Sequence, residues 1–307
     1  MTLLNPNRTT WAMGAWDVLS AKIVERAGFD AVGIQSLQVA IVNGVPDIGI
    51  IGPDRLVDLC RRVRRAVSIP IVVDFEQGFG DPYAAVYWMK ELEGAGVSAI
   101  HIDDYGLPFK CTFFPPYEMG LESVESTAAK IKAMVAARST SDLMILGRPG
   151  TYVATVFQDE AERRRDWLAR AQAYLRAGAD AIFAICPSVE LAKFFRASVD
   201  CPLMTIRTLG TETSEQRFQY QPEITQLSIR DIYDLGYEMF IEPTPLLGVS
   251  INAMVAAAKR IRQSERSDVV AAEHGSLDHM LREWAESDSV EQIHSNRSVN
   301  VRARSDQ

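Results

Sequence analysis

Two acidic residues stand at the end of an apolar, β-branched segment, where residues 71–80 read Ile-Val-Val-Asp-Phe-Glu-Gln-Gly-Phe-Gly. Such a run predicts a strand that is buried on both faces, as in a parallel sheet. Because residues i and i+2 of an extended segment point to the same side, we expect Asp74 and Glu76 to project together from the strand end. Paired carboxylates at that position predict a site for a hard divalent cation such as Mg²⁺, which takes oxygen ligands. The alternative is a solvated loop whose acids have no function or cap the next helix.

The composition is that of a globular protein, since 47% of the 307 residues are hydrophobic and 23% are charged. No apolar run reaches the roughly 18 residues of a membrane span, and the N-terminus lacks an apolar stretch of signal-peptide length. Four widely spaced cysteines without a CxxC pair predict a cytoplasmic location rather than a disulfide scaffold. The net charge of −8 argues against nucleic acid as a partner but permits a small carboxylate substrate.

A short phrase recurs along the chain, in which a glycine follows a helix-like segment and an apolar strand-like segment comes next. Glycine just past a helix end is the usual C-cap, so each copy predicts the joint between a helix and a strand. With four further strand-like segments, the pattern predicts an α/β fold of eight units, a (β/α)₈ TIM-type barrel; an open doubly wound sheet is the alternative. The predicted helices that precede the phrase are Val18–Arg26, Ala84–Glu93, Glu162–Arg176 and Ile229–Asp234, and the further strands are Thr9–Gly14, Ile69–Asp74, Leu143–Arg148 and Pro202–Arg207.

The domain organisation follows from where this pattern ends. We expect residues 1–263 to form the barrel and residues 264–307 to form a C-terminal helical extension with a flexible tail. Within the extension, Leu277 to Trp284 has apolar residues at helical spacing. That helix is expected to pack either on its own barrel or on a neighbouring subunit.

The predicted strand ends converge, because barrels of this class build their sites from the C-terminal ends of their strands. Acidic residues there would face two arginines, Arg148 and Arg207, and this combination fits a metal-bound anion that is gripped by guanidinium groups. His101 lies inside a predicted strand and is interpreted as a packed core residue. It shares a face with Asp103, so the alternative is a supporting role beside that acid. The strand-end residues are Gln35, Ser36, Asp74, Glu76, Asp103, Asp104, Arg148, Ile185, Cys186, Arg207 and Glu242.

A series of motifs, in this order, resembles the isocitrate lyase and phosphoenolpyruvate mutase superfamily, particularly its short methylisocitrate lyase-like members. Gly14–Ala21 is similar to P-G-A-Y-D-A-L-S-A, Asn43–Gly49 to G-L-P-D-x-G, Val73–Gly80 to V-D-A-D-T-G-Y-G, Ile100–Asp104 to I-H-I-E-D, and Gly147–Arg148 to the A-R-T-D strand end. The resemblance implies a cytoplasmic barrel enzyme that requires Mg²⁺, or Mn²⁺ in its place, and acts on 2-oxo or 2-hydroxy acids. It also implies a homotetramer whose subunits exchange a C-terminal helix.

The resemblance also implies roles for individual residues. Asp74, Glu76 and Asp103 would hold the metal ion, partly through waters, and Asp47 would lie beside it. Ser36 would help to bind the substrate carboxylate, and Arg148 would steady the anion. We also expect Asp47, Lys110 and Arg207 to be among the substrate-binding residues. Arg148 would also stabilise charge that develops during the reaction.

The gating loop departs from the family pattern. The lyases carry K-[KR]-C-G-H, whereas this chain has Phe109-Lys110-Cys111-Thr112-Phe113. Cys111 is retained beside a cation that lowers its thiol pKa, so it is a candidate acid or base; the alternative is an inherited, idle cysteine. Ile185 and Ile206 stand where the lyases carry Glu and, nearby, Asn, which argues against a tricarboxylate substrate.

Three functions remain open at this point. The first is a carbon–carbon bond lyase that cleaves a substituted malate-type acid through an enolate-like intermediate, with Cys111 and Arg148 as catalytic residues. The second is a 2-oxo acid hydrolase or decarboxylase, or a phosphonopyruvate-type mutase, on the same scaffold. The third is a catalytically inactive barrel that serves as a binding subunit.

Overall fold

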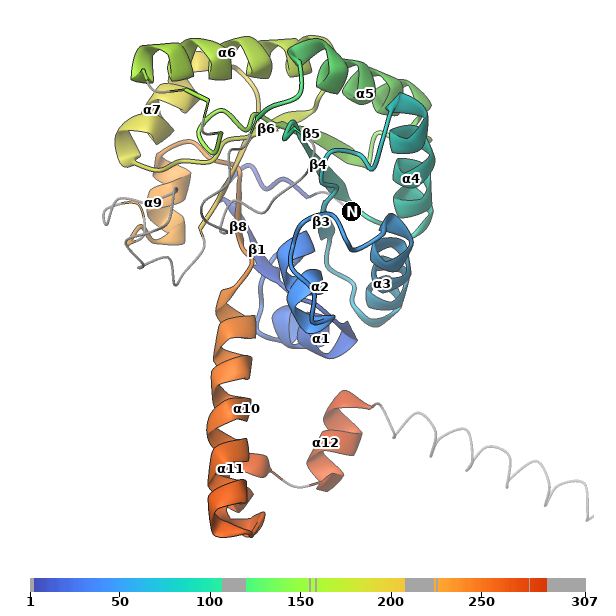
Figure 1. Ribbon diagram of the computed structural model, residues 1–307, viewed down its shortest axis with the longest axis vertical. Helices are drawn as coiled ribbons and strands as arrows, with labels where there is room; N and C mark the ends of the chain where they lie inside the picture. The colour runs from blue at the N-terminus through green and yellow to red at the C-terminus, as the bar shows by residue number, and fades with distance from the viewer. Residues whose placement is uncertain are drawn as a thin grey trace, which may run out of the picture. The chain divides into compact units, whose positions relative to one another are not determined.

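Eight parallel strands close into a barrel in the order in which they occur along the chain, which confirms the (β/α)₈ prediction. The computed structural model describes residues 3–106, 120–154, 156–157, 159–207, 224, 226–275 and 277–285. Figure 1 shows the strands at the centre of the barrel with the helices around them. The strands are β1 (Thr10–Gly14), β2 (Ala31–Ile34), β3 (Ile71–Asp74), β4 (Ala99–Asp103), β5 (Met144–Arg148), β6 (Ala181–Phe183), β7 (Leu203–Ile206) and β8 (Met239–Glu242).

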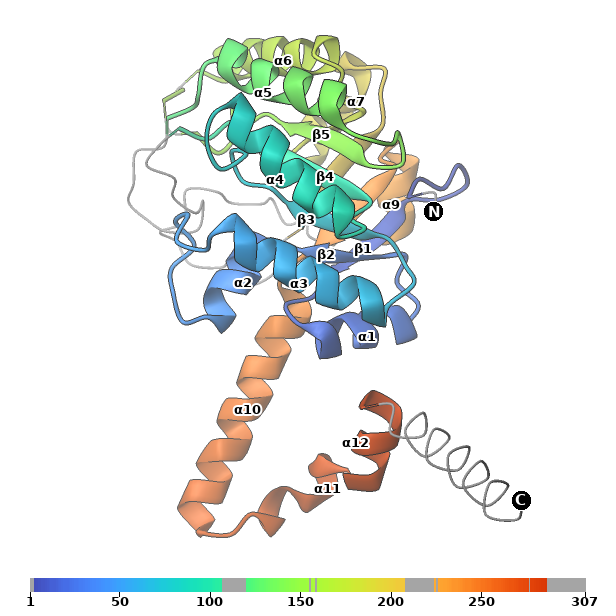
Figure 2. The same cartoon turned by 90° about the vertical axis from the view of Figure 1, so that its right-hand side faces the viewer.

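Four helices of the barrel end at the glycine of the recurring motif, as predicted. These glycines, Gly28, Gly96, Gly178 and Gly236, have φ between 79° and 100°, a left-handed conformation that residues with a Cβ rarely adopt. Figure 2 shows α3, α4 and α5 covering neighbouring strands. The helices are α1 (Val18–Arg26), α2 (Ser36–Val42), α3 (Pro53–Ala66), α4 (Pro82–Gly94), α5 (Val124–Ala137), α6 (Glu160–Arg176), α7 (Val189–Ser198) and α9 (Ile229–Asp234).

The barrel has two apolar cores, because successive side chains of a strand point to opposite faces. On β4, Ile100 and Ile102 belong to the large core between strands and helices, whereas Ala99 belongs to the smaller core inside the barrel. His101 has the same parity as Ala99 and packs edge-on against Phe183 of the inner core, with ring centroids 4.8 Å apart. Asp103, at the C-terminal end of β4, has the same parity as Ala99 and His101 and therefore also points inward.

The chain divides into two compact units, Met1–Leu247 and Gly248–Gln307. The last helices of the chain are α10 (Pro245–Ser264), a short 3₁₀ helix (Asp268–Val270), α11 (Ala271–His274) and α12 (Leu277–Trp284). The helix predicted from the spacing at Leu277 to Trp284 is confirmed. The proposed boundary at residue 264 stays a prediction, and the tail from residue 286 lies outside the described residues. No helix in the described ranges is both long enough and apolar enough to cross a membrane.

Candidate active site

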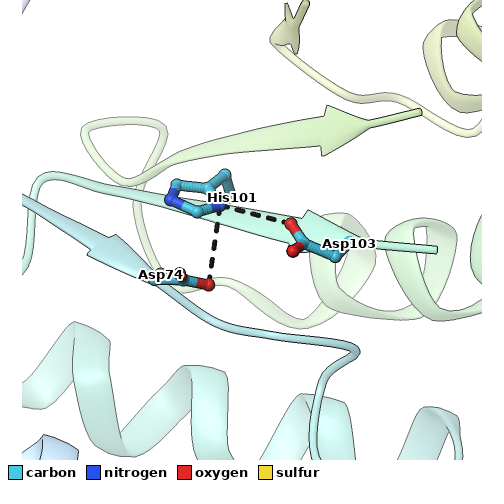
Figure 3. A group of neighbouring side chains, drawn as sticks. All are labelled: Asp74, His101 and Asp103. Carbon is cyan, nitrogen blue, oxygen red and sulfur yellow. Dashed lines mark ion pairs between the residues drawn. The ribbon is translucent and has the colours of Figure 1, made fainter. Parts of the chain in front are cut away.

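Three side chains at the ends of β3 and β4 form a buried group that could hold a metal ion. One ligand atom from each of Asp74, His101 and Asp103 lies within 4.8 Å of the other two. Dashed lines in Figure 3 join the His101 ring to both carboxylates, with its Nδ1 atom 3.8 Å from Asp74 Oδ1 and 3.5 Å from Asp103 Oδ1. The register of the sheet produces this group, because Asp74 pairs with His101 across β3 and β4.

The orientation of the His101 ring is set by Gln35, which precedes α2. The side-chain amide of Gln35 donates to the Ile34 carbonyl, so its Oε1 atom faces His101 Nε2 at 3.2 Å. Nε2 is then the donor of this hydrogen bond, and Nδ1 is directed at the acids. Nδ1 is buried without a hydrogen-bond partner among the described residues. His101 is therefore both the packed core residue that the sequence predicted and a neighbour of Asp103 on the shared face, and the structure adds its contact with Asp74.

The side chain of Glu76 comes from a turn after β3, whereas the sequence suggested an extended segment. Strand β3 ends at Asp74, and Glu76 has a positive φ of 45°, so the two side chains are not related by an extended segment. The Glu76 amide donates to Asp74 Oδ1 (3.0 Å), and its carbonyl accepts from the Asp103 amide (2.6 Å). Burial and the charges of Asp74, Asp47 and Asp103 raise the pKa of Glu76 to about 9. The turn thus places a third carboxyl group beside the other acids.

Arg148 supplies positive charge at the same end of the barrel. It pairs with Asp103 in the register of β4 and β5, and its Nη1 atom lies 3.0 Å from Asp103 Oδ2. Its guanidinium lies over the rings of Phe183 (4.6 Å) and Tyr105 (5.5 Å). Burial raises the pKa of Asp103, while the Arg148 charge opposes that rise. This is the arginine–carboxylate neighbourhood that the sequence analysis anticipated at the strand ends.

The other predicted site residues are placed differently. Ser36 donates to Asp74 Oδ2 (3.2 Å), and the buried Asp47 is close enough for its charge to raise the pKa of Glu76. Arg207 instead pairs with Glu242 (2.7 Å) and lies over Phe240, a residue of the outer core. Its role in substrate binding stays a prediction, as do those of Cys111 and Lys110, which lie outside the described residues.

Lys130 of α5 is a buried residue that the sequence analysis did not single out. Its ammonium donates to the Gln77 carbonyl (2.9 Å) and to the carboxylate of Glu122 (2.7 Å). It therefore ties the loop that contains Glu76 to the segment before α5. A lysine among the buried positions Thr127, Ile131 and Met134 of one helix face was the signal that the sequence offered.

The donor set fits a divalent cation. Four buried carboxyl groups, those of Asp47, Asp74, Glu76 and Asp103, lie close together and Arg148 pairs with one of them. Burial first, and then the charges of the neighbouring acids, raise the pKa of Glu76. A hard cation with oxygen ligands would relieve that repulsion, and the His101 Nδ1 atom offers a nitrogen at the same point.

Comparison with known proteins decides the family. A family model described as phosphoenolpyruvate phosphomutase matches residues 1–262. The chain belongs to this family. Within it, the chain is 32% identical to 2,3-dimethylmalate lyase from Eubacterium barkeri over 256 residues, which cover 82% of this chain and 81% of that protein. It is 29% identical to probable 2-methylisocitrate lyase 2 from Corynebacterium glutamicum over 246 residues, 80% of this chain and 73% of the relative.

A solved structure has the same fold as this chain. Phosphonopyruvate hydrolase, in complex with oxalate and Mg²⁺, superposes with a TM-score of 0.80 at 25% sequence identity. The match covers 96% of this chain and 99% of that structure. The resemblance inferred from the motifs is therefore confirmed at the level of the family.

Proposed function

We propose that this protein is a Mg²⁺-dependent carbon–carbon bond lyase that cleaves a substituted malate-type 2-hydroxy or 2-oxo acid. The observation that carries the proposal is the buried group of Asp74, Glu76 and Asp103 facing Arg148 at the barrel mouth. The relatives named dimethylmalate lyase and methylisocitrate lyase support the reaction class. The oxalate and Mg²⁺ bound by the hydrolase relative support the metal, for which Mn²⁺ is a substitute.

Asp74, Glu76 and Asp103 would hold the ion, with Asp47 beside it. Bound Mg²⁺ would supply electrostatic stabilisation for negative charge that develops on a substrate oxygen. Arg148 carries a planar guanidinium at the same end of the barrel, so it would grip the substrate carboxylate in a fork and fix its orientation. Because these residues are buried, little water would compete for the charges that they bind.

Four further side chains complete this proposal. Ser36 donates to Asp74, and its hydroxyl could turn to a substrate carboxylate instead. In the loop that carries Lys110 and Cys111, the thiol would transfer the proton on the departing carbon and the ammonium would lower the thiol pKa. Arg207 would contribute to carboxylate binding only after leaving Glu242.

The wall of the inner core supports an alkyl-substituted substrate. Phe183, Ile185 and Ile206 belong to or pack against the apolar cluster inside the barrel. Phe183 also lies under the Arg148 guanidinium, so this apolar surface adjoins the proposed carboxylate site. An alkyl substituent would bury its surface there, whereas a further carboxylate would be left without a partner.

The decisive experiment is Mg²⁺ binding by calorimetry with and without oxalate, a mimic of the enolate. We expect wild type to bind both, Asp74→Ala to lose both, and the control Asp58→Ala, at an exposed position of α3, to behave as wild type. A wild type that binds neither would leave only the inactive-barrel hypothesis.

A second assay separates the two catalytic hypotheses. Substituted malates such as 2,3-dimethylmalate and 2-methylisocitrate are offered together with phosphonopyruvate, and product release is followed. The hydrolase relative is the observation that favours the second candidate, a 2-oxo acid hydrolase, decarboxylase or mutase. Cys111→Ala should abolish cleavage by a lyase, because only that reaction needs the thiol, and should spare hydrolysis.

We also propose that the chain forms a homotetramer that exchanges its C-terminal helix, with residues 264–307 as the extension. The apolar side chains of Val249, Met254 and Val255 on α10 are 68%, 63% and 47% exposed, and a partner subunit would cover them. Light scattering after gel filtration should show a tetramer that Met254→Glu dissociates and the control Lys259→Glu does not. A cytoplasmic location completes the proposal, in keeping with free thiols at Cys60, Cys186 and Cys201.

A further inference from the structure

The two neighbouring acids at the end of β4 face opposite sides of the barrel wall. Asp103 points inward to Arg148, whereas Asp104 points outward into the layer between strands and helices and is completely buried. Its Oδ1 atom accepts a hydrogen bond from the Gly150 amide (2.7 Å). Its Oδ2 atom accepts from the Tyr174 hydroxyl (2.5 Å) and from Arg170 (3.1 Å). Both carboxylate oxygens are therefore occupied by contacts with other segments.

Arg170 extends these contacts to the other loops of the mouth. Besides Asp104, it donates to the Glu122 carbonyl (2.9 Å) and to Asp166 (2.8 Å). Asp166 in turn accepts from the Thr151 hydroxyl (2.6 Å). One face of α6 thus joins the end of β4, the segment before α5 and the loop after β5.

The main chain on both sides of Arg148 lies against this network. A Cβ atom added at Gly150 would come within 2.7 Å of Asp104 Oδ1, and one at Gly147 within 2.8 Å of the Tyr174 ring. These close approaches are open only to glycine. The main chain at Arg148 is consequently fixed on both sides, by Gly147 against Tyr174 and by Gly150 against Asp104. These contacts lie on the face opposite to the Arg148 side chain.

We propose that Asp104, together with Arg170 and Tyr174, is a positioning residue for Arg148. By fixing the end of β5 from outside, the network places the Arg148 guanidinium against Asp103 and toward the substrate carboxylate. Asp104 touches neither substrate nor metal in this scheme; it acts through the backbone of Gly150 and, through Tyr174, on the main chain at Gly147. This proposal adds a positioning role to the proposed function, and its binding test rests on that function because the test requires the protein to bind oxalate.

A competing account is that the network only stabilises the fold, and a matched control separates the two. At the other end of β5, Asp180 accepts from the Ile145 amide (2.8 Å) and pairs with Arg138 (2.5 Å). Asp180→Asn therefore removes a comparable interaction from the same strand, far along it from Arg148. We expect both Asp104→Asn and Asp180→Asn to lower the melting temperature.

The test is a double-mutant cycle on oxalate binding in saturating Mg²⁺. Asp104→Asn should raise the oxalate Kd about tenfold, as losses of such supporting contacts do, while Asp180→Asn leaves it unchanged. In an Arg148→Ala background, Asp104→Asn should change the Kd by less than about twofold, because its effect passes through the missing guanidinium. Equal effects in both backgrounds, or none in either, would overturn the inference.

Two further measurements keep the inference decidable. If Asp104→Asn does not fold, Tyr174→Phe removes one hydrogen bond and keeps the ring beside Gly147, and the same cycle is run with it. If wild type binds no oxalate, the proposed function fails, and a crystal structure of the variant decides the inference alone. Arg148 displaced from Asp103 would support it, and an unchanged ion pair would refute it.

Discussion

Binding of Mg²⁺ should expel a proton from Glu76. Burial and three neighbouring acids raise the pKa of this group from 4.5 to about 9, so at pH 7 the metal-free protein holds Glu76 protonated. A cation that binds the Glu76 carboxylate must displace that proton. The Mg²⁺ Kd of wild type should therefore fall by up to about tenfold per pH unit between pH 6 and 8. Glu76→Gln carries no such proton, so it should release about one proton fewer than wild type for each Mg²⁺ bound.

Calorimetry in two buffers of different ionisation enthalpy at pH 7 measures the number of protons released per Mg²⁺. Wild type should release about one more proton than Glu76→Gln. The control Glu125→Gln removes an exposed carboxylate from the first turn of α5 and should match wild type. Because Asp103 also has a raised pKa, the difference between variants, rather than the total, reports Glu76.

Two results would refute this reasoning. The first is a wild-type Mg²⁺ affinity that does not change between pH 6 and 8. The second is equal proton release from wild type and Glu76→Gln. Either result would mean that the acids are not coupled to the metal as their burial implies.

Three other outcomes are expected. In EDTA, the stability that Glu76 contributes is fully present below pH 4.5 and is lost as the pH rises toward about 9, because its pKa is raised in the folded protein. The melting temperature of wild type should therefore fall across that window more steeply than that of Glu76→Gln. Arg148→Lys should weaken oxalate binding in Mg²⁺ by about tenfold or more, since an ammonium cannot bind in a fork; calorimetry that finds an unchanged Kd would remove Arg148 from the substrate site. Gly150→Ala should cost about 1–3 kcal/mol in urea unfolding, because its Cβ would lie 2.5 Å from the Tyr105 ring, whereas Gly94→Ala, with open space around it, should be neutral or stabilising.

The sequence determined the elements and the fold class. Helix–glycine–strand joints are local features, because the glycine must take a left-handed conformation whatever surrounds it, and α1 and α9 were predicted with their observed bounds. Four such joints and four further strands leave the closed barrel as the leading architecture, and in a closed barrel the C-terminal ends of all eight strands meet at one mouth. The sequence therefore predicted that Asp74, Glu76, Asp103 and Arg148 would gather at one end.

The tertiary structure decided which of these side chains meet. A shift of one residue along a strand reverses the face of a side chain, so Arg148 points into the mouth while Arg207 pairs with Glu242 beside the outer core. The contact of His101 with Asp74 depends on the register of two strands that are 24 residues or more apart in sequence. Local propensity carries no information on such pairings, because they are fixed only when the barrel closes and every strand must satisfy two neighbours at once.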